Sequence, residues 1–330
     1  MTSYNITKFA VIGAGNMGSG IAQKIATEGF KVVLVDLDDE KVARGIGIIK
    51  SMLDQGVERK VFRPAQAEAI LANIEGTSDW SKLGDVDLVV EAVFENMDVK
   101  KSVFERLSQN CKPTCILGTN TSSFLVKELV DSVTNPERLV GLHYFFHPAK
   151  NRLVEVIGHE GTSDEVYRAT WASQEAIGKT PIYSADAPGF VVNRYFVPWV
   201  NEGVRLLGEN VANIATIEWA AKKAFNVGMG PFELMNVTGV PISLHAATSL
   251  GDQLGDFYYP GQALKDFCAT GEANWPLGGD VDESKYQAIA DRLLGATFYV
   301  AAQLVEEEVA SVLETDIGAR VGLRWPKGPF

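Results

Sequence analysis

Cysteine and histidine are scarce in this sequence of 330 residues, which contains three cysteines and four histidines. Three cysteines cannot form a framework of disulfides, and four histidines offer little material for a His-rich metal site. We therefore expect no metal site. Cys111 and Cys115 are interpreted as two reduced thiols near the end of a helix. The thiols, and the lack of a secretory signal segment before Lys8, predict a cytoplasmic protein.

Positive charge is also in short supply. The chain has 30 Lys and Arg against 42 Asp and Glu, which gives a net charge of −12. Such a surface repels nucleic acid and anionic lipid, so we expect neither nucleic acid nor a membrane as a partner. No stretch approaches the roughly 18 apolar residues that span a bilayer. A hydrophobic share of 46% argues against disorder, and the length predicts two hydrophobic cores.

A glycine-rich turn lies near the start of the chain. The apolar run Phe9–Ile12 predicts a buried parallel strand, and the sequence GAGNMG follows it before a helical pattern that ends at Gly29. Gly13 permits a tight turn, Gly15 lets the backbone approach a pyrophosphate, and Gly18 lets helix and strand pack closely. The amides at the start of the helix would face the anion.

An aspartate ends the next apolar run. Asp36 follows Val32–Val35 and lies 23 residues beyond Gly13. A carboxylate at this place accepts hydrogen bonds from the adenosine ribose and repels a 2′-phosphate, which predicts NAD rather than NADP. A purely structural turn is the alternative, but strand, helix, strand and acid are all in register. The expected cofactor contacts of this segment are Gly13, Gly15, Asn16, Met17, Gly18 and Asp36.

Strands and helices go on alternating. Further strands are predicted at residues 87–93, 115–118 and 139–142, and a helix at about 98–109. This order predicts an α/β protein with an N-terminal Rossmann-type doubly wound sheet. The ligand of such a sheet lies at the carboxyl ends of the strands, which is where Glu95, Asn120 and His143 fall.

Five later blocks identify a family. They are Asn120–Ser123, Gly141–Phe145, Leu153–Ile157, Pro188–Arg194 and Gly230–Leu234. With the glycine turn, they make the whole chain resemble the L-3-hydroxyacyl-CoA dehydrogenases, which include 3-hydroxybutyryl-CoA dehydrogenases and multifunctional fatty-acid oxidation proteins. The resemblance implies an all-helical C-terminal domain, NAD as cofactor and an acyl-CoA as substrate in β-oxidation or fermentative lipid metabolism.

The resemblance also implies a set of catalytic residues. His143 would be the general base that takes the C3 hydroxyl proton, a task that suits a group titrating near neutral pH. Glu155 would hold the second ring nitrogen and favour the imidazolium. Ser122 and Asn193 would hydrogen-bond the reacting oxygen and orient the substrate. Considered singly, Ser122 and Asn193 are more simply a helix cap and a surface amide, whereas the ordered set favours catalysis.

Three further residues are expected to contact the cofactor, two of which, Glu95 and Lys100, match positions of the family. Glu95 and Lys100 would lie along the nicotinamide half of NAD, and Asn120 would lie beside them. Asn120 is also a plain candidate for a helix cap near Phe124.

The chain departs from the family after His143. The family usually continues Phe-Phe-Asn-Pro, whereas this chain reads Tyr-Phe-Phe-His-Pro-Ala-Lys-Asn-Arg from Tyr144 to Arg152. The spacing from His143 to Glu155 is kept, which argues against His147 as the base. The more polar and basic loop predicts an altered acyl pocket, including one for a cyclic or functionalised acyl group.

A local excess of cations follows the second strand. Residues 41–63 carry six Lys and Arg against two acids, a local charge of +4. Apolar residues at helical spacing predict a helical excursion here. The family places CoA against such an excursion, and a solvated amphipathic hairpin is an equal alternative.

The second half is predicted to be helical, with a boundary at Asp186–Gly189. An internal repeat pairs Asn201–Val204 and Gly230–Phe232 with Glu306–Val309 and Gly328–Phe330. We expect an NAD-binding Rossmann domain at 1–186, a helical dehydrogenase C-terminal domain at 187–295 and a partial second helical repeat at 296–330. Because the second copy stops early, we expect the dehydrogenase part of a longer polypeptide, with a homodimer or a fusion to an enoyl-CoA hydratase-type domain.

The sequence thus predicts NAD-dependent, reversible oxidation of an (S)-3-hydroxyacyl-CoA to a 3-ketoacyl-CoA. One alternative is a dehydrogenase of free 3-hydroxy acids, although that class typically uses a lysine base. The other is an NAD(H)-binding protein without turnover, in which the set of His143, Glu155, Ser122 and Asn193 would have no evident use.

Overall fold

The first of two compact units holds every strand of the protein that the structure describes. The computed structural model describes residues 4–330, and the chain divides into Met1–Asp186 and Ala187–Phe330. The strands of the first unit are β1 Lys8–Ile12, β2 Lys31–Val35, β3 Ile74–Thr77, β4 Leu88–Glu91, β5 Ile116–Thr119, β6 Leu139–Tyr144, β7 Leu153–Gly158 and β8 Thr180–Ala185. Its α-helices are α1 Asn16–Thr27, α2 Asp39–Glu58, α3 Pro64–Leu71, α4 Met97–Asn110 and α5 Asp164–Ala176.

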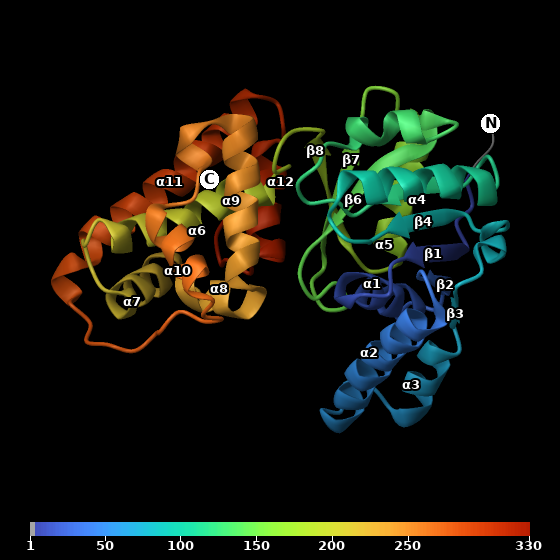
Figure 1. Cartoon of the computed structure of the whole chain (residues 1–330), viewed down its shortest axis with the longest axis horizontal. Coiled ribbons are helices and arrows are strands. Elements are labelled where there is room, and N and C mark those ends of the chain that lie inside the picture. Colours follow the sequence, from blue (N-terminus) through green and yellow to red (C-terminus); the bar gives the residue numbers. More distant parts are fainter. Residues whose placement is uncertain (1–3) are drawn as a thin grey trace. The chain divides into compact units, whose positions relative to one another are not determined.

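The eight strands form one sheet in the order β3-β2-β1-β4-β5-β6-β7-β8 (Figure 1). The chain runs outward from β1 through β2 to β3, then returns to the other side of β1 with β4. Doubly wound sheets bind their ligands at such a reversal, in a crevice at the carboxyl ends of the strands, which here are the ends of β1 and β4. The central strands are buried and mostly apolar, as expected for a sheet that helices cover on both faces. The predicted α/β class and Rossmann-type sheet are confirmed.

Two features of the sheet differ from the prediction. Strand β3 has the sequence Ile-Glu-Gly-Thr, which lacks an apolar run because it lies half-exposed at the sheet edge. Strands β6 and β7 pair antiparallel, whereas the neighbouring pairs are parallel. Only residues 145–152 separate β6 from β7, too few for the crossover that a parallel pair needs.

Helices α2 and α3 form the predicted helical excursion between β2 and β3 (Figure 1). Val42, Ile49 and Leu53 recur at helical spacing on α2 and are buried against the core of the unit. The side chain of Asp38 accepts a hydrogen bond from the amide of Lys41 and caps the helix.

The second unit is helical. Its helices are α6 Val192–Gly208, α7 Ile214–Phe225, α8 Pro231–Thr238, α9 Val240–Leu254, α10 Gln262–Thr270, α11 Tyr286–Glu306 and α12 Val312–Ile317. Helix α11 packs along α6, and the buried residues of the two helices form the centre of this unit. The predicted all-helical C-terminal part is confirmed.

The internal repeat has a different register from the predicted one. Asn210 and Glu308 both have positive φ angles, and so do Asn226 and Arg324. In each pair the second residue lies 98 residues after the first, the same offset that separates the two Gly-Pro-Phe sequences. The copies therefore align Glu209 with Glu307, not Glu202 with Glu307, and α6 is the counterpart of α11. The second copy begins well before residue 296.

Helix α11 also changes one expectation about membranes. The stretch Glu283–Glu306 is long and apolar enough to span a bilayer by length and composition, contrary to the expectation that no stretch would be. Almost half of its most apolar window is buried inside the protein, as in the core helix of a globular domain. Its apolar side chains serve the packing against α6 and α7.

Candidate active site

The glycine turn connects β1 to α1 at the opening of the crevice. Gly13 has φ of 104°, and a side chain there would meet the carbonyl oxygen of Ala92, which follows β4. Gly15 and Asn16 are exposed at the start of α1, so the first amides of the helix face outward. A helix N-terminus with exposed amides and the positive end of the helix dipole suits a pyrophosphate.

Asp36 closes the other side of this turn. One carboxylate oxygen accepts a hydrogen bond from the Ala14 amide at 2.7 Å, and the other accepts one from the Leu37 amide at 2.7 Å. The acid at the end of β2 is thus fixed directly over the glycine turn. The residues present fit a dinucleotide, because exposed amides, a glycine-rich turn and a carboxylate meet at one end of the sheet.

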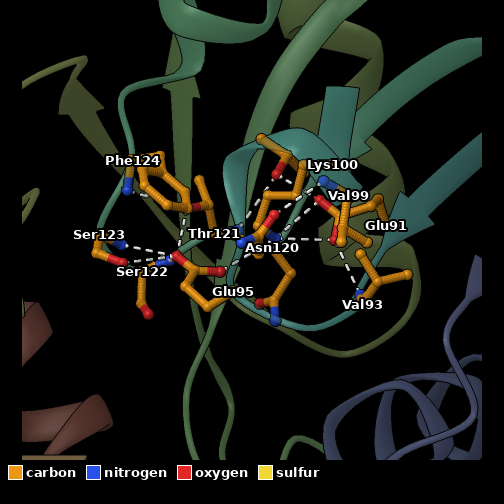
Figure 2. Close-up of polar contacts among 12 residues, drawn as sticks. Glu91, Val93, Glu95, Val99, Lys100, Asn120, Thr121, Ser122, Ser123 and Phe124 are labelled. Atoms are coloured by element: carbon orange, nitrogen blue, oxygen red, sulfur yellow. Dashed lines mark hydrogen bonds and ion pairs between the residues drawn. The ribbon is translucent and has the colours of Figure 1, made fainter. Parts of the chain in front are cut away.

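A buried lysine links two carboxylates beside the crevice (Figure 2). The Lys100 side chain is 0% exposed, and its ammonium lies 2.9 Å from Glu91 and 3.0 Å from Glu95. Glu91, the last residue of β4, also accepts hydrogen bonds from Thr119 and the Val93 amide. The ammonium thus contacts two carboxylates, and Glu91 also accepts from two neutral donors, so the buried charges are paired.

Glu95 organises the segment after β5 (Figure 2). One of its oxygens accepts hydrogen bonds from the hydroxyls of Thr121 and Ser123 and from the amides of Ser122 and Ser123. Burial alone would raise the pKa of Glu95, but the Lys100 ammonium and these hydrogen bonds outweigh burial and lower it to about 2. The ionised carboxylate therefore holds the turn on which the exposed Ser122 stands.

Asn120 connects that turn to the strand that carries His143. Its side-chain oxygen accepts a hydrogen bond from the backbone amide of Tyr144 at 2.8 Å, and its backbone amide donates to the backbone carbonyl of Glu91. Asn120 therefore fixes the end of β6 relative to β4 and β5. This contact is different from the predicted helix cap.

His143 and Glu155 form a pair across β6 and β7. They are direct partners in the antiparallel register, and Nδ1 of His143 lies 2.5 Å from Oε2 of Glu155. Glu155 is fully buried, whereas 5% of His143 is exposed. A carboxylate on Nδ1 orients the ring, fixes which nitrogen bears the proton and favours the charged imidazolium.

The buried side chain of Lys179 binds the polar loop after His143. Its ammonium donates to the carbonyls of Pro148 at 2.5 Å and Asn151 at 2.7 Å, and it lies 5.2 Å from the centre of the Tyr144 ring. Burial, with a smaller contribution from the charge of Lys24, lowers the pKa of Lys179 to about 7.

The remaining predicted residue, Asn193, belongs to the second unit. It is the second residue of α6 and is half-buried. The structure brings Glu95, Lys100, Asn120, Ser122, His143 and Glu155 together through the contacts above. The place of Asn193 beside them stays a prediction.

Sequence reasoning missed Glu91, Lys179 and Arg194, three charged side chains that the structure buries. Glu91 had a usable signal, because an acid that ends an apolar strand needs a buried partner, as Glu155 does. Lys179 and Arg194 stand in mixed polar stretches without such a signal.

No metal-binding group emerges within residues 4–330, where no three His, Cys, Asp or Glu side chains are arranged to hold an ion. The three cysteines are free, and Cys111 and Cys115 are buried next to the end of α4. Cys111 lies at the predicted helix end, and the reduced state of the two thiols stays a prediction.

The fold and the crevice together define a dinucleotide-binding α/β protein with a helical C-terminal unit. Residues 8–187 match the family model of the 3-hydroxyacyl-CoA dehydrogenase NAD binding domain, and residues 189–278 match that of the C-terminal domain. The chain therefore belongs to the 3-hydroxyacyl-CoA dehydrogenase family of NAD-dependent oxidoreductases. The predicted family and cofactor are confirmed.

Individual relatives agree with the family models. A 3-hydroxybutyryl-CoA dehydrogenase of Clostridioides difficile is 34% identical over 257 residues, covering 78% of this chain and 92% of that protein. A fatty acid oxidation complex subunit alpha of Shewanella amazonensis is 32% identical, but this chain, 98% covered, spans only 50% of it. The structure of the (S)-3-hydroxybutyryl-CoA dehydrogenase of Ralstonia eutropha is 32% identical with a TM-score of 0.78, covering 82% of this chain and 96% of that one.

Proposed function

We propose that this protein oxidises the C3 hydroxyl of an (S)-3-hydroxyacyl-CoA to the 3-ketone, reversibly, with His143 as the general base. The observation that carries the proposal is the His143–Glu155 pair at the carboxyl end of the sheet that bears the glycine turn. When bound, NAD⁺ accepts the hydride that leaves C3. His143 takes the hydroxyl proton, and Glu155 stabilises the charge that the ring then carries.

The other site residues would bind and orient. Ser122 is exposed on the turn that Glu95 holds, which suits a donor to the reacting oxygen. We assign the same task to Asn193 at the start of α6. Glu95 and Asn120 would border the nicotinamide half of the cofactor, and the fully buried Lys100 would act through Glu95.

The excursion of α2 and α3 would hold the CoA part of the substrate. Lys50, Arg59, Lys60 and Arg63 are exposed there, whereas Lys41 pairs with Asp38 and Arg44 with Glu40. Exposed cations on an otherwise acidic protein favour a phosphorylated ligand. The double variant Lys60→Glu, Arg63→Glu should raise KM for the CoA ester about tenfold and leave NADH binding unchanged. An unchanged KM would favour the solvated hairpin.

Two alternatives make different demands on the site. A dehydrogenase of free 3-hydroxy acids typically needs a lysine base, but Lys100 is buried between two carboxylates and Lys179 is committed to loop carbonyls. A protein that only binds NAD(H) has no need for the His143–Glu155 pair. Both observations favour the acyl-CoA dehydrogenase.

The cellular setting is part of the proposal. We infer a cytoplasmic enzyme, and we infer that it works either as a homodimer or as part of a longer multifunctional chain. Relatives of both lengths support the second inference.

The test measures NADH oxidation with acetoacetyl-CoA by the wild type and by His143→Ala, and repeats the assay with NADPH. We expect turnover with NADH, a loss of about 10²- to 10⁴-fold on substitution, and little activity with NADPH. Unchanged NADH binding in the variant, measured by fluorescence, would assign the loss to chemistry. A wild type that binds NADH but turns over no hydroxyacyl-CoA or ketoacyl-CoA would refute the proposal.

A further inference from the structure

The helical unit contains two ion pairs in equivalent positions of its two copies. Arg194 of α6 pairs with Glu307, which follows α11, and Arg292 of α11 pairs with Glu209, which follows α6. Arg292 lies 98 residues after Arg194, and Glu307 lies 98 residues after Glu209. Each copy thus supplies the arginine of one pair and the glutamate of the other.

The two pairs differ in their surroundings. The Arg194 side chain is 3% exposed, and Nη2 lies 2.5 Å from Oε2 of Glu307. Its Nε donates to the Tyr258 hydroxyl at 3.3 Å, and that hydroxyl lies 3.4 Å from Oε1 of Gln303 on α11. By contrast, the Arg292 side chain is 33% exposed and pairs with both Glu202 and Glu209.

The positions next to the two arginines differ as well. Asn193 precedes Arg194 and is the second residue of α6, three residues after Phe190, which like Gly189 has a positive φ angle. Asp291 precedes Arg292, is exposed and accepts a hydrogen bond from Gln287 within its own helix. Only the first pair, within the described helical unit, therefore adjoins a residue expected to contact the substrate.

We propose that Arg194 is a positioning residue for Asn193, and that the second helical copy supports substrate binding by supplying Glu307 to Arg194. The inference rests on the proposed function, in which Asn193 orients the substrate. The buried Arg194 side chain is held by a carboxylate and a hydroxyl, so it ties the first turn of α6, which carries Asn193, to Glu307 and Tyr258. Neutralising Glu307 leaves a buried cation underpaired and lets the first turn of α6 move. A shift of about 1 Å in a group that orients the substrate costs on the order of 10²-fold in rate.

The test compares Glu307→Gln with Glu209→Gln, its counterpart in the other copy. Both changes are isosteric at partly exposed side chains, so folded protein is expected from each. We expect Glu307→Gln to lower kcat/KM for the acyl-CoA at least tenfold, with NADH affinity unchanged, whereas Glu209→Gln stays within about twofold of the wild type. Tyr258→Phe should show a smaller loss of the same kind.

A double variant separates positioning from general stability. If Glu307 acts through Asn193, Asn193→Ala and the double variant Asn193→Ala, Glu307→Gln should have the same kcat/KM. The inference would be overturned if the losses in kcat/KM of the two single variants added up in the double variant. It would also be overturned if Glu307→Gln and Glu209→Gln lost kcat/KM equally and in proportion to their fall in melting temperature. The proposed function fails separately, if the wild type shows no turnover or if Asn193→Ala has full activity.

Discussion

His143 and Glu155 are direct cross-strand neighbours, with Nδ1 and Oε2 2.5 Å apart between two antiparallel strands. Opposite residues of an antiparallel pair point to the same face of the sheet, so the backbone register alone brings the imidazole to the carboxylate. Because Glu155 is fully buried, its charge is directed at the ring and not at water. Strand pairing thereby determines the orientation of the proposed base.

Replacing Glu155 with glutamine should lower kcat by about 10²- to 10³-fold. The amide keeps the shape of the side chain but cannot stabilise an imidazolium, and it can favour the wrong tautomer of His143. We expect NADH affinity to stay the same, because Glu155 is not among the expected cofactor contacts. Steady-state kinetics and NADH fluorescence would measure the two effects. Glu160→Gln, at an exposed position beyond the same strand, is the control, and a kcat for Glu155→Gln equal to that of the control would contradict the assigned role.

Two alanine substitutions in the glycine turn should impair different properties, Gly18→Ala the stability and Gly15→Ala the binding of NADH. A methyl group on Gly18 would lie 1.8 Å from the Gly13 carbonyl oxygen, so Gly18→Ala should lower the melting temperature strongly. A methyl group on Gly15 meets no atom within 4 Å in the described chain, so Gly15→Ala should fold normally. It should nevertheless weaken NADH binding about tenfold or more, because the methyl group enters the space of the pyrophosphate.

Thermal melting and NADH titration would distinguish these two effects, with Gly47→Ala as the control in α2. Gly47 also has open space around it and is exposed on α2. Equal NADH affinity in Gly15→Ala and Gly47→Ala would place the pyrophosphate elsewhere.

The Glu95 carboxylate should make the protein sensitive to acid. Its pKa is lowered from 4.5 to about 2 in the folded state, so its stabilising effect is complete above pH 4.5 and is lost as the pH falls toward 2. A shift of this size corresponds to about 3 kcal/mol. Glu95→Gln should therefore be less stable than the wild type at pH 7, and the difference should shrink as the pH is lowered. Urea unfolding between pH 3 and 7 would measure it; a difference independent of pH would contradict the ionised state of Glu95.

Lys179 should make the stability depend on pH in the alkaline range, again with a rise as the pH increases. Its pKa is lowered from 10.5 to about 7, so between these values the unfolded chain binds a proton that the folded protein does not. The free energy of unfolding then rises with pH, by up to about 1.4 kcal/mol for each pH unit. The wild type should gain stability relative to Lys179→Met from pH 7.5 to 9.5. In Lys24→Met, which removes the neighbouring charge, the same rise should begin at higher pH. Parallel curves for the wild type and Lys179→Met would rule out the lowered pKa.

Much of the first unit could be predicted from local pattern. The strands β1, β2, β4 and β5 are buried on both faces and read as short apolar runs bounded by glycine or acid. Strand β3 could not be found in this way, because an edge strand that is half-exposed has no such run. The antiparallel pairing of β6 with β7 results from the short connection, residues 145–152. It could be predicted only once the bounds of both strands were known.

The candidate site was predicted where a polar residue follows or interrupts an apolar strand. Asp36, Asn120, His143 and Glu155 all fit that description. Lys100 lies on an amphipathic helix among other charged residues, so the sequence does not show that its side chain is fully buried. The register of the helical repeat was also missed. Equivalent positions such as Asn210 and Glu308 share a positive φ angle but have different side chains, so a comparison of residue types does not align them.

The two copies of the helical repeat can be compared within one chain. Residues that both copies share can be separated from a residue that differs between them. The arginine and glutamate of the ion pairs are present in both copies, and so are the backbone bends at Asn210 and Glu308. The residue before the arginine differs, being Asn193 in one copy and Asp291 in the other. If Asn193 orients the substrate as proposed, one copy would serve both ligand binding and packing, whereas the other would serve packing and ion pairing alone. The two halves of the bundle would then differ in task through one side chain.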